Sequence, residues 1–132
     1  MQAEYKLAGD KAIVMEFENK IEPEVNKKVR RVYMAIDKKA LKGVEEVIPT
    51  YRSLLIIYNP LEKDKDELIN RLEEINNNLE KYDLEDPRVI EIPTVYGGEY
   101  GPDLQYVADY NNLSTEKVIK IHTSRKYLVY ML

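Results

Sequence analysis

The order of its apolar segments constrains the fold of this chain most strongly. Within the first 82 of the 132 residues, two short strands and a helix follow one another, and the same order then repeats. Strands are expected over 4–7 and 12–17, because a turn fits at Gly9 and Asp10 between two apolar runs. Residues 44–58 are expected to form two further strands. Their segment "LLIIY" is apolar at consecutive positions, which is typical of a strand at the centre of a sheet.

Amphipathic helices are expected after each pair of strands, over 22–41 and 64–81. Apolar residues recur at helical spacing in both segments, and Asp64 is a candidate cap for the second. Gly43 is expected to end the first helix. Pairs of strands between helices favour an antiparallel sheet with both helices on one side. The predicted fold class is therefore α+β, as a ββαββα two-layer sandwich.

A polar segment with a proline, "DLEDPR", follows the second helix and predicts a domain boundary. We expect an α+β domain over 1–82, a linker over 83–87 and the start of a second domain over 88–132. In this last part, strands are expected at "VIEIPTVY" and "KYLVYML", with helices near 103–111 and 115–122 between them. Its 45 residues are close to the roughly 40-residue limit for independent domains, so the second domain is expected to be truncated.

Charge and composition exclude several function classes. The net charge is −4 and the pI about 5.2, which disfavours nucleic acid and acidic membranes as partners. The absence of cysteine excludes disulfides, thiolate metal sites and cysteine catalysis. The sequence shows neither a secretory signal nor an apolar run of roughly 20 residues, so a cytoplasmic location is expected. A single histidine gives no metal site.

The segment "YGGEYGPDL" contains three of the five glycines. One hypothesis is that the backbone N–H groups of Gly97, Gly98 and Gly101 bind an anion near a helix that starts at Asp103. The alternative, which we favour, is a tight connection that Asp103 caps, because the Gly-Lys-Ser/Thr of a phosphate loop is absent. Tyr96 could stack on a flat ligand or simply pack.

Three more side chains are candidates for chemistry. His122 is a candidate catalytic residue, because imidazole suits acid–base work, although a structural role at a helix end is the favoured alternative. Arg52 and Ser53 lie in a turn between two buried strands. The Arg52 guanidinium could hold a carboxylate, or it could pair with Glu45 or Glu46 across the strands.

The segments "GDKAIVMEF", "YRSLLIIYNP", "IEIPTVYGGEYGPDL" and "NNLSTEKVIKIHTSRKYLVYML" together resemble one known family. It is the family of the B subunit of bacterial 5-oxoprolinase (PxpB), whose members are also described as KipI-type kinase-A inhibitors and as allophanate hydrolase subunit 1. The resemblance covers essentially the whole chain and implies that it is the N-terminal portion of a longer protein. It also implies a DCoH-like (pterin dehydratase) fold for the first domain and a cyclophilin-like β-rich second domain.

The same resemblance implies a function. Family members act with 5-oxoprolinase subunits A and C to convert 5-oxoproline to glutamate with ATP hydrolysis, and this chain alone is expected to be inactive. ATP is thus an expected cofactor of the complex. His122 falls in a motif position of the family. The alternative is an inhibitor that binds the dimerisation domain of a sensor histidine kinase.

Overall fold

The computed structural model describes residues 2–82 and 88–131. The chain divides into two compact units, one of residues 1–86 and 130–132 and the other of residues 87–129. The predicted linker, 83–87, lies outside the described residues.

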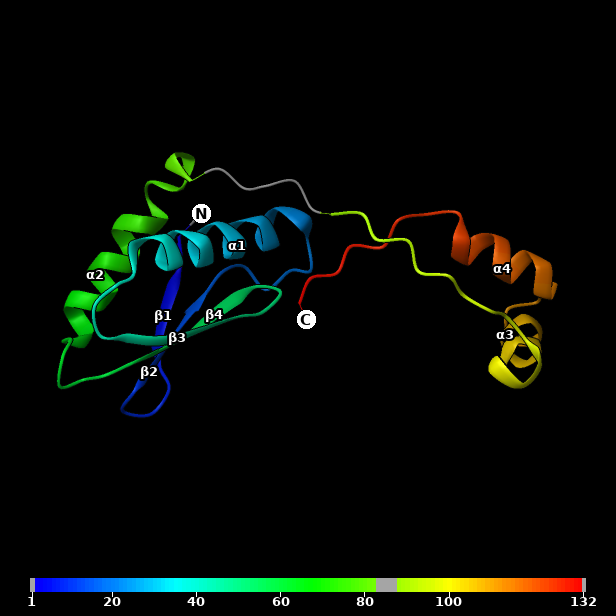
Figure 1. The fold of residues 1–132 in the computed structure, drawn as a ribbon, viewed down its shortest axis with the longest axis horizontal. Helices are drawn as coiled ribbons and strands as arrows, with labels where there is room; N and C mark the ends of the chain where they lie inside the picture. The colour runs from blue at the N-terminus through cyan, green and yellow to red at the C-terminus, as the bar shows by residue number, and fades with distance from the viewer. Residues whose placement is uncertain (1, 83–87, 132) are drawn as a thin grey trace. The chain divides into compact units, whose positions relative to one another are not determined.

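The first unit is an α+β fold with a four-stranded antiparallel sheet (Figure 1). Its elements follow the order ββαββα, as the sequence predicts. The second helix ends at Asn76 and not at the predicted residue 81, and a short 3₁₀ turn follows it. The elements are β1 Glu4–Leu7, β2 Ala12–Glu16, α1 Pro23–Lys39, β3 Val44–Pro49, β4 Ser53–Tyr58, α2 Lys65–Asn76 and η1 Leu79–Lys81. The strand order in the sheet is β1-β2-β4-β3, so β2 and β4 are central and β1 and β3 are edges.

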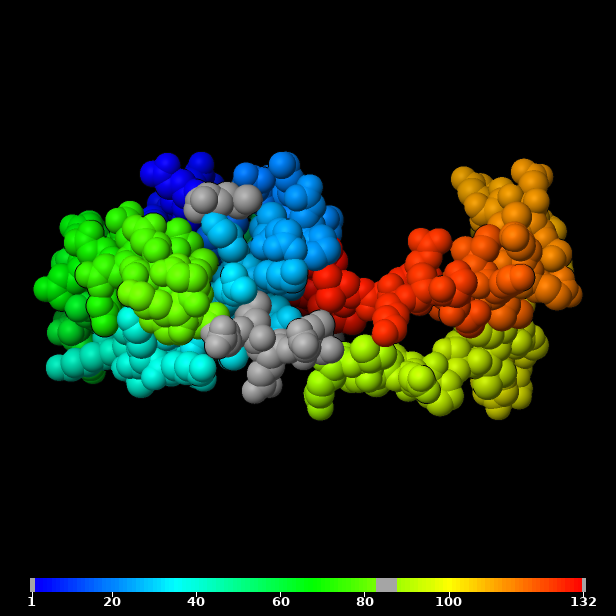
Figure 2. Space-filling view, turned by 90° about the horizontal axis from the view of Figure 1, so that it is seen from above, coloured from blue at the N-terminus to red at the C-terminus, as the bar shows by residue number. Residues whose placement is uncertain are grey.

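Alternation along the central strands separates a covered face of the sheet from an open one. In β2, Ile13 and Met15 are fully buried, whereas the flanking Val14 and Glu16 are only half-buried. The buried residues join the apolar stripes of α1 and α2 in one core, which includes Val29, Leu54, Ile56, Leu68 and Leu72. The side chains of α1 and α2 also lie against each other (Figure 2). Both helices therefore cover the same face.

The structure confirms the predicted start of α2 but not the predicted end of α1. The Asp64 carboxylate accepts hydrogen bonds from the main-chain N–H of Asp66 at 2.8 Å and of Glu67 at 3.2 Å, which confirms the predicted cap. The first helix ends earlier than Gly43, because Ala40 takes the left-handed conformation with φ 42° and ψ 62°. Gly43 instead lies in the connection to β3 with φ +82°.

The second unit contains η2 Gly98–Tyr100, α3 Leu104–Tyr110 and α4 Thr115–Thr123. The two α-helices pack against each other around Ala108, and the hydroxyl of Ser114 caps α4 by accepting from the N–H of Lys117 at 3.2 Å. Both short helices were predicted from the sequence.

The two strands predicted over 88–132, at "VIEIPTVY" and "KYLVYML", are wrong for the described residues. Residues 88–96 and 126–131 form neither helix nor strand. Their apolar side chains, including Val89, Ile92 and Val129, are exposed. A strand exists only when another strand fills its backbone hydrogen bonds, and the described residues provide no such partner here. Among the described helices, none is long and apolar enough to cross a membrane.

Candidate functional site

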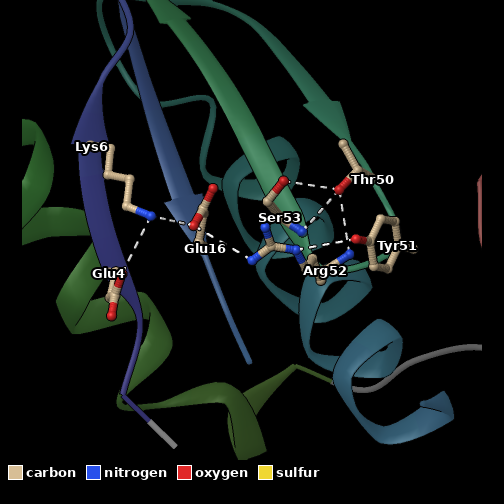
Figure 3. A network of polar contacts seen from close by, with 7 residues as sticks. All are labelled: Glu4, Lys6, Glu16, Thr50, Tyr51, Arg52 and Ser53. Carbon is tan, nitrogen blue, oxygen red and sulfur yellow. Dashed lines mark hydrogen bonds and ion pairs between the residues drawn. The ribbon is translucent and has the colours of Figure 1, made fainter. Parts of the chain in front are cut away.

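The turn that carries Arg52 and Ser53 is held by the side chain of Thr50. The Thr50 hydroxyl accepts from the N–H of Ser53 at 3.0 Å and from the N–H of Arg52 at 3.3 Å, and it shares a hydrogen bond with the Ser53 hydroxyl at 2.9 Å (Figure 3). The N–H of Thr50 in turn donates to the carbonyl of Ser53 at 2.8 Å. The turn is closed by its own groups, and the Ser53 hydroxyl already has a partner.

Arg52 points across the sheet to Glu16 and not to Glu45 or Glu46, so the predicted ion pair with those residues is wrong. Its Nη1 lies 3.5 Å from Glu16 Oε2, and its Nε donates to the hydroxyl of Tyr51 at 3.3 Å. The reason is register, since Glu16 of β2 stands opposite Ser53 of β4. The hydrogen bond to Tyr51, followed by the charge of Glu16, raises the pKa of Arg52.

Glu16 is the centre of this cluster. Its Oε2 also lies 2.6 Å from the ammonium of Lys6, which in turn lies 3.5 Å from Glu4. The hydrogen bond from Lys6 is the largest cause of a lowered pKa at Glu16, with Arg52 contributing further. Two cations thus share one carboxylate on the open face of the sheet. The guanidinium of Arg52 keeps N–H groups that neither Glu16 nor Tyr51 uses, and these could bind a second carboxylate.

The glycine segment of the second unit, residues 96–104, forms a turn that is closed by hydrogen bonds between its own main-chain groups. Gly97 and Gly98 have φ of +77° and +60°, a region that favours glycine. The N–H of Gly101 donates to the carbonyl of Gly97 at 3.1 Å, and the N–H of Leu104 donates to the carbonyl of Gly101 at 3.2 Å. One of the three N–H groups considered for an anion is therefore already used inside the turn.

Asp103 does not form the predicted cap. It is the residue before α3, but its backbone is helical, with φ −90° and ψ −4°, and its side chain makes no capping hydrogen bond. An N-cap side chain reaches the first turn from an extended backbone, which Asp103 lacks. The connection between Gly101 and Leu104 satisfies that end of the helix instead.

Two predicted residues, Tyr96 and His122, lie together in the second unit. The Tyr96 hydroxyl is 2.5 Å from Nδ1 of His122, and the two rings meet edge to face with centroids 5.8 Å apart. A third residue, Tyr127, donates its hydroxyl to the main-chain carbonyl of His122 at 3.0 Å. The histidine is exposed, and Tyr96 is half-buried. This arrangement can present the free edge of an imidazole in a fixed orientation.

The structure therefore forms two clusters of predicted residues, one in each unit. Sequence reasoning missed Lys6, Glu16, Thr50 and Tyr51 in the first and Tyr127 in the second. Glu16 lies beside the turn because β2 pairs with β4 in the sheet. This pairing cannot be read from the order of the strands along the chain. Tyr127 was predicted to lie in a strand, so its hydrogen bond to His122 of α4 was not expected.

Two hollows in the first unit, of about 470 Å³ and 610 Å³, lie away from these clusters. The smaller is lined by Lys63 and Arg71, but their charges are paired with Glu67 and Glu74 respectively. Among residues 2–82 and 88–131, no group of three or more histidine, aspartate or glutamate side chains is placed to hold a metal ion.

Comparison with known proteins identifies relatives over nearly the whole chain. A family model described as "Carboxyltransferase domain, subdomain C and D" matches residues 3–132. A protein of Bacillus subtilis (strain 168), named as the B subunit of 5-oxoprolinase, is 38% identical over 138 residues, which cover 94% of this chain and 56% of that protein. The protein of the same name from Escherichia coli O157:H7 is 33% identical over 126 residues, covering 96% and 56%.

A solved structure shows the same likeness. The crystal structure of a conserved uncharacterized protein from Pyrococcus horikoshii is 38% identical, with a TM-score of 0.55 over 92% of this chain and 56% of that one. The chain thus spans about half the length of the curated relatives that it matches.

Proposed function

Because the chain belongs to the family of the carboxyltransferase domain, subdomain C and D, we propose that it is the N-terminal portion of the B subunit of an ATP-dependent 5-oxoprolinase. The observation that carries this proposal is its 38% identity, over 94% of its length, to a protein named as the B subunit of 5-oxoprolinase. The complex, with subunits A and C, would convert 5-oxoproline to glutamate while it hydrolyses ATP. The 132 residues alone would be inactive.

The lactam explains why the reaction needs ATP. An amide carbonyl is a poor electrophile, and phosphorylation of its oxygen would make it a good one. The described contacts mark no nucleotide site in this chain, however. The Gly101 N–H is used inside its own turn, and Lys63 and Arg71 are paired with carboxylates. The nucleotide is therefore assigned to no residue of this chain.

Each unit offers one candidate for contact with the substrate, and the two candidates are proposed separately. 5-Oxoproline carries a carboxylate, and Arg52 offers N–H groups that its two partners leave unused. His122 offers an imidazole edge that could contact the reacting amide. Ser53 is a weaker candidate, since its hydroxyl is held by Thr50. Gly97, Gly98 and Asp103 are proposed to shape the turn beside Tyr96.

The finer fold assignments are part of the same proposal. The ββαββα order and the antiparallel sheet support a DCoH-like first domain. The exposed apolar segments 88–96 and 126–131 support the start of a β-rich, cyclophilin-like domain whose remaining strands would supply their backbone partners.

The kinase-inhibitor alternative has no comparable support. Both curated relatives described above bear the name of an enzyme subunit. No described contact in the chain distinguishes a surface for a histidine-kinase helix pair.

The test is an omission assay with the full-length protein. We would mix it with purified subunits A and C, 5-oxoproline and ATP, and follow glutamate and phosphate release together. We expect both products only when all three proteins are present. An assembled three-protein complex that releases no glutamate would refute the proposal.

A further inference from the structure

His122 is held from two sides within the second unit. From the glycine segment, the Tyr96 hydroxyl lies 2.5 Å from its ring nitrogen Nδ1. From the segment after α4, the ring of Tyr127 lies tilted by 41° against the imidazole, with centroids 5.4 Å apart, and its hydroxyl donates to the main-chain carbonyl of His122. The ring orientation is therefore set by residues on both flanks of the two short helices.

The hydrogen bond at Nδ1 has two possible directions. A neutral imidazole has one protonated nitrogen and one acceptor nitrogen, and the contact itself does not say which is which. A phenol O–H is a stronger donor than the N–H of a neutral imidazole, and an imidazole nitrogen is a stronger acceptor than a phenol oxygen. When the hydroxyl donates, the bond joins the stronger donor to the stronger acceptor and leaves the Nε2–H of the ring unused. This direction is therefore favoured.

We propose that Tyr96 is a positioning residue that fixes His122 as the tautomer protonated at Nε2. In this state Nε2 is a hydrogen-bond donor, and it has no partner among the described residues. His122 would then donate a hydrogen bond to an oxygen of the lactam substrate and would not act as a general base. This role rests on the proposed function, whereas the tautomer itself does not.

The chain offers a direct test, because His122 is its only histidine. Two-dimensional ¹H–¹⁵N NMR of the 132-residue chain at pH 9 reports the tautomer of a single ring without any need for assignment. We expect the Nε2–H pattern, with Nδ1 as a hydrogen-bonded acceptor. Tyr96→Phe should populate the Nδ1–H form as well.

Tyr127→Phe is the matched control. It removes a hydroxyl that also contacts His122, but through the main chain and not through the ring, so the tautomer should stay as in the wild type. A wild-type ring protonated at Nδ1, or a tautomer ratio that Tyr96→Phe leaves unchanged, would overturn the proposal.

The catalytic consequence is measured in the full-length three-protein complex. Tyr96→Phe should lower kcat on the order of 10–100-fold with little change in KM for 5-oxoproline, since misorientation affects the reacting geometry more than binding. Equal kcat values for Tyr96→Phe and the wild type would refute the positioning role. A wild-type complex without activity would refute the proposed function, and the NMR result would still decide the tautomer.

Discussion

A Cβ atom on Gly101 would lie 2.7 Å from the main-chain nitrogen of Gly97. Real Cβ atoms essentially never come so close to a backbone atom. The turn between residues 96 and 104 is closed by this approach, together with the hydrogen bond from the N–H of Gly101 to the carbonyl of Gly97. The glycines are needed for the geometry of the chain itself, whether or not a ligand binds nearby.

Gly101→Ala should disrupt this turn more than Gly98→Ala does. The first substitution forces two backbone segments apart. The second meets no atom within 4 Å and costs about 1–2 kcal/mol for its positive φ. Hydrogen exchange of the α3 amides is the measurement, and we expect faster exchange in Gly101→Ala than in Gly98→Ala. Equal exchange in the two variants would show that the close approach does not hold the turn.

Arg52→Lys should weaken substrate binding in the full-length complex. An ammonium cannot reproduce the two-pronged contact of a guanidinium with a carboxylate, so KM for 5-oxoproline should rise on the order of tenfold at nearly constant kcat. Steady-state glutamate release measures both constants. Glu46→Gln is the control, because Glu46 is exposed and makes no contact with Arg52, and its KM should match the wild type. An unchanged KM in Arg52→Lys would remove Arg52 from the site.

Asp64 gives a prediction with a defined pH dependence. The N–H groups of Glu67 and Asp66 lower the pKa of its carboxyl below the ordinary value of 3.8. A depressed pKa contributes stability that is present above the unfolded-state pKa and is lost as pH falls through the folded-state pKa. Asp64→Ala should therefore melt below the wild type at pH 7, and the gap should close below about pH 4. Thermal melts from pH 2 to pH 7 test this, and a gap independent of pH would contradict the charged cap.

Ala40→Gly should stabilise the first unit. Ala40 ends α1 with φ 42°, a backbone conformation in which a Cβ atom costs about 1–2 kcal/mol. Glycine removes this strain, but its greater freedom in the unfolded state lowers the free energy of unfolding by about 0.4–1 kcal/mol. A net gain between zero and about 1.6 kcal/mol is expected in the free energy of unfolding measured in urea. Lys38→Gly, two residues earlier and inside the helix, should instead lose about 1 kcal/mol. A loss in both variants would mean that the end of the helix is not strained.

The sequence predicts the first unit well because its signals are local and agree with one another. The strand through Ile13 and Met15, the apolar stripe through Val29 and the cap at Asp64 all follow from short-range patterns. The end of α1 at Ala40 was missed because the strongest stop signal, Gly43, lies three residues further on.

The structure of the second unit and the contacts around Arg52 and His122 were harder to predict, because they depend on residues far apart in the sequence. Whether "VIEIPTVY" forms a strand depends on a partner strand, which no local pattern supplies. The pairing of Arg52 with Glu16 depends on β2 lying beside β4, a contact between residues 36 positions apart. The Tyr96–His122 contact likewise spans 26 positions. Candidate residues could be chosen from their chemistry, but their partners required the fold.

The most direct test of the central claim is the substrate dependence of phosphate release by the complex of the full-length protein with subunits A and C. 5-Oxoproline and allophanate would be supplied separately at equal concentration with ATP. We predict that 5-oxoproline stimulates phosphate release with an equal amount of glutamate formed, and that allophanate stimulates none. Stimulation by allophanate alone, or phosphate release that 5-oxoproline does not change, would contradict the assignment of this chain to a 5-oxoprolinase.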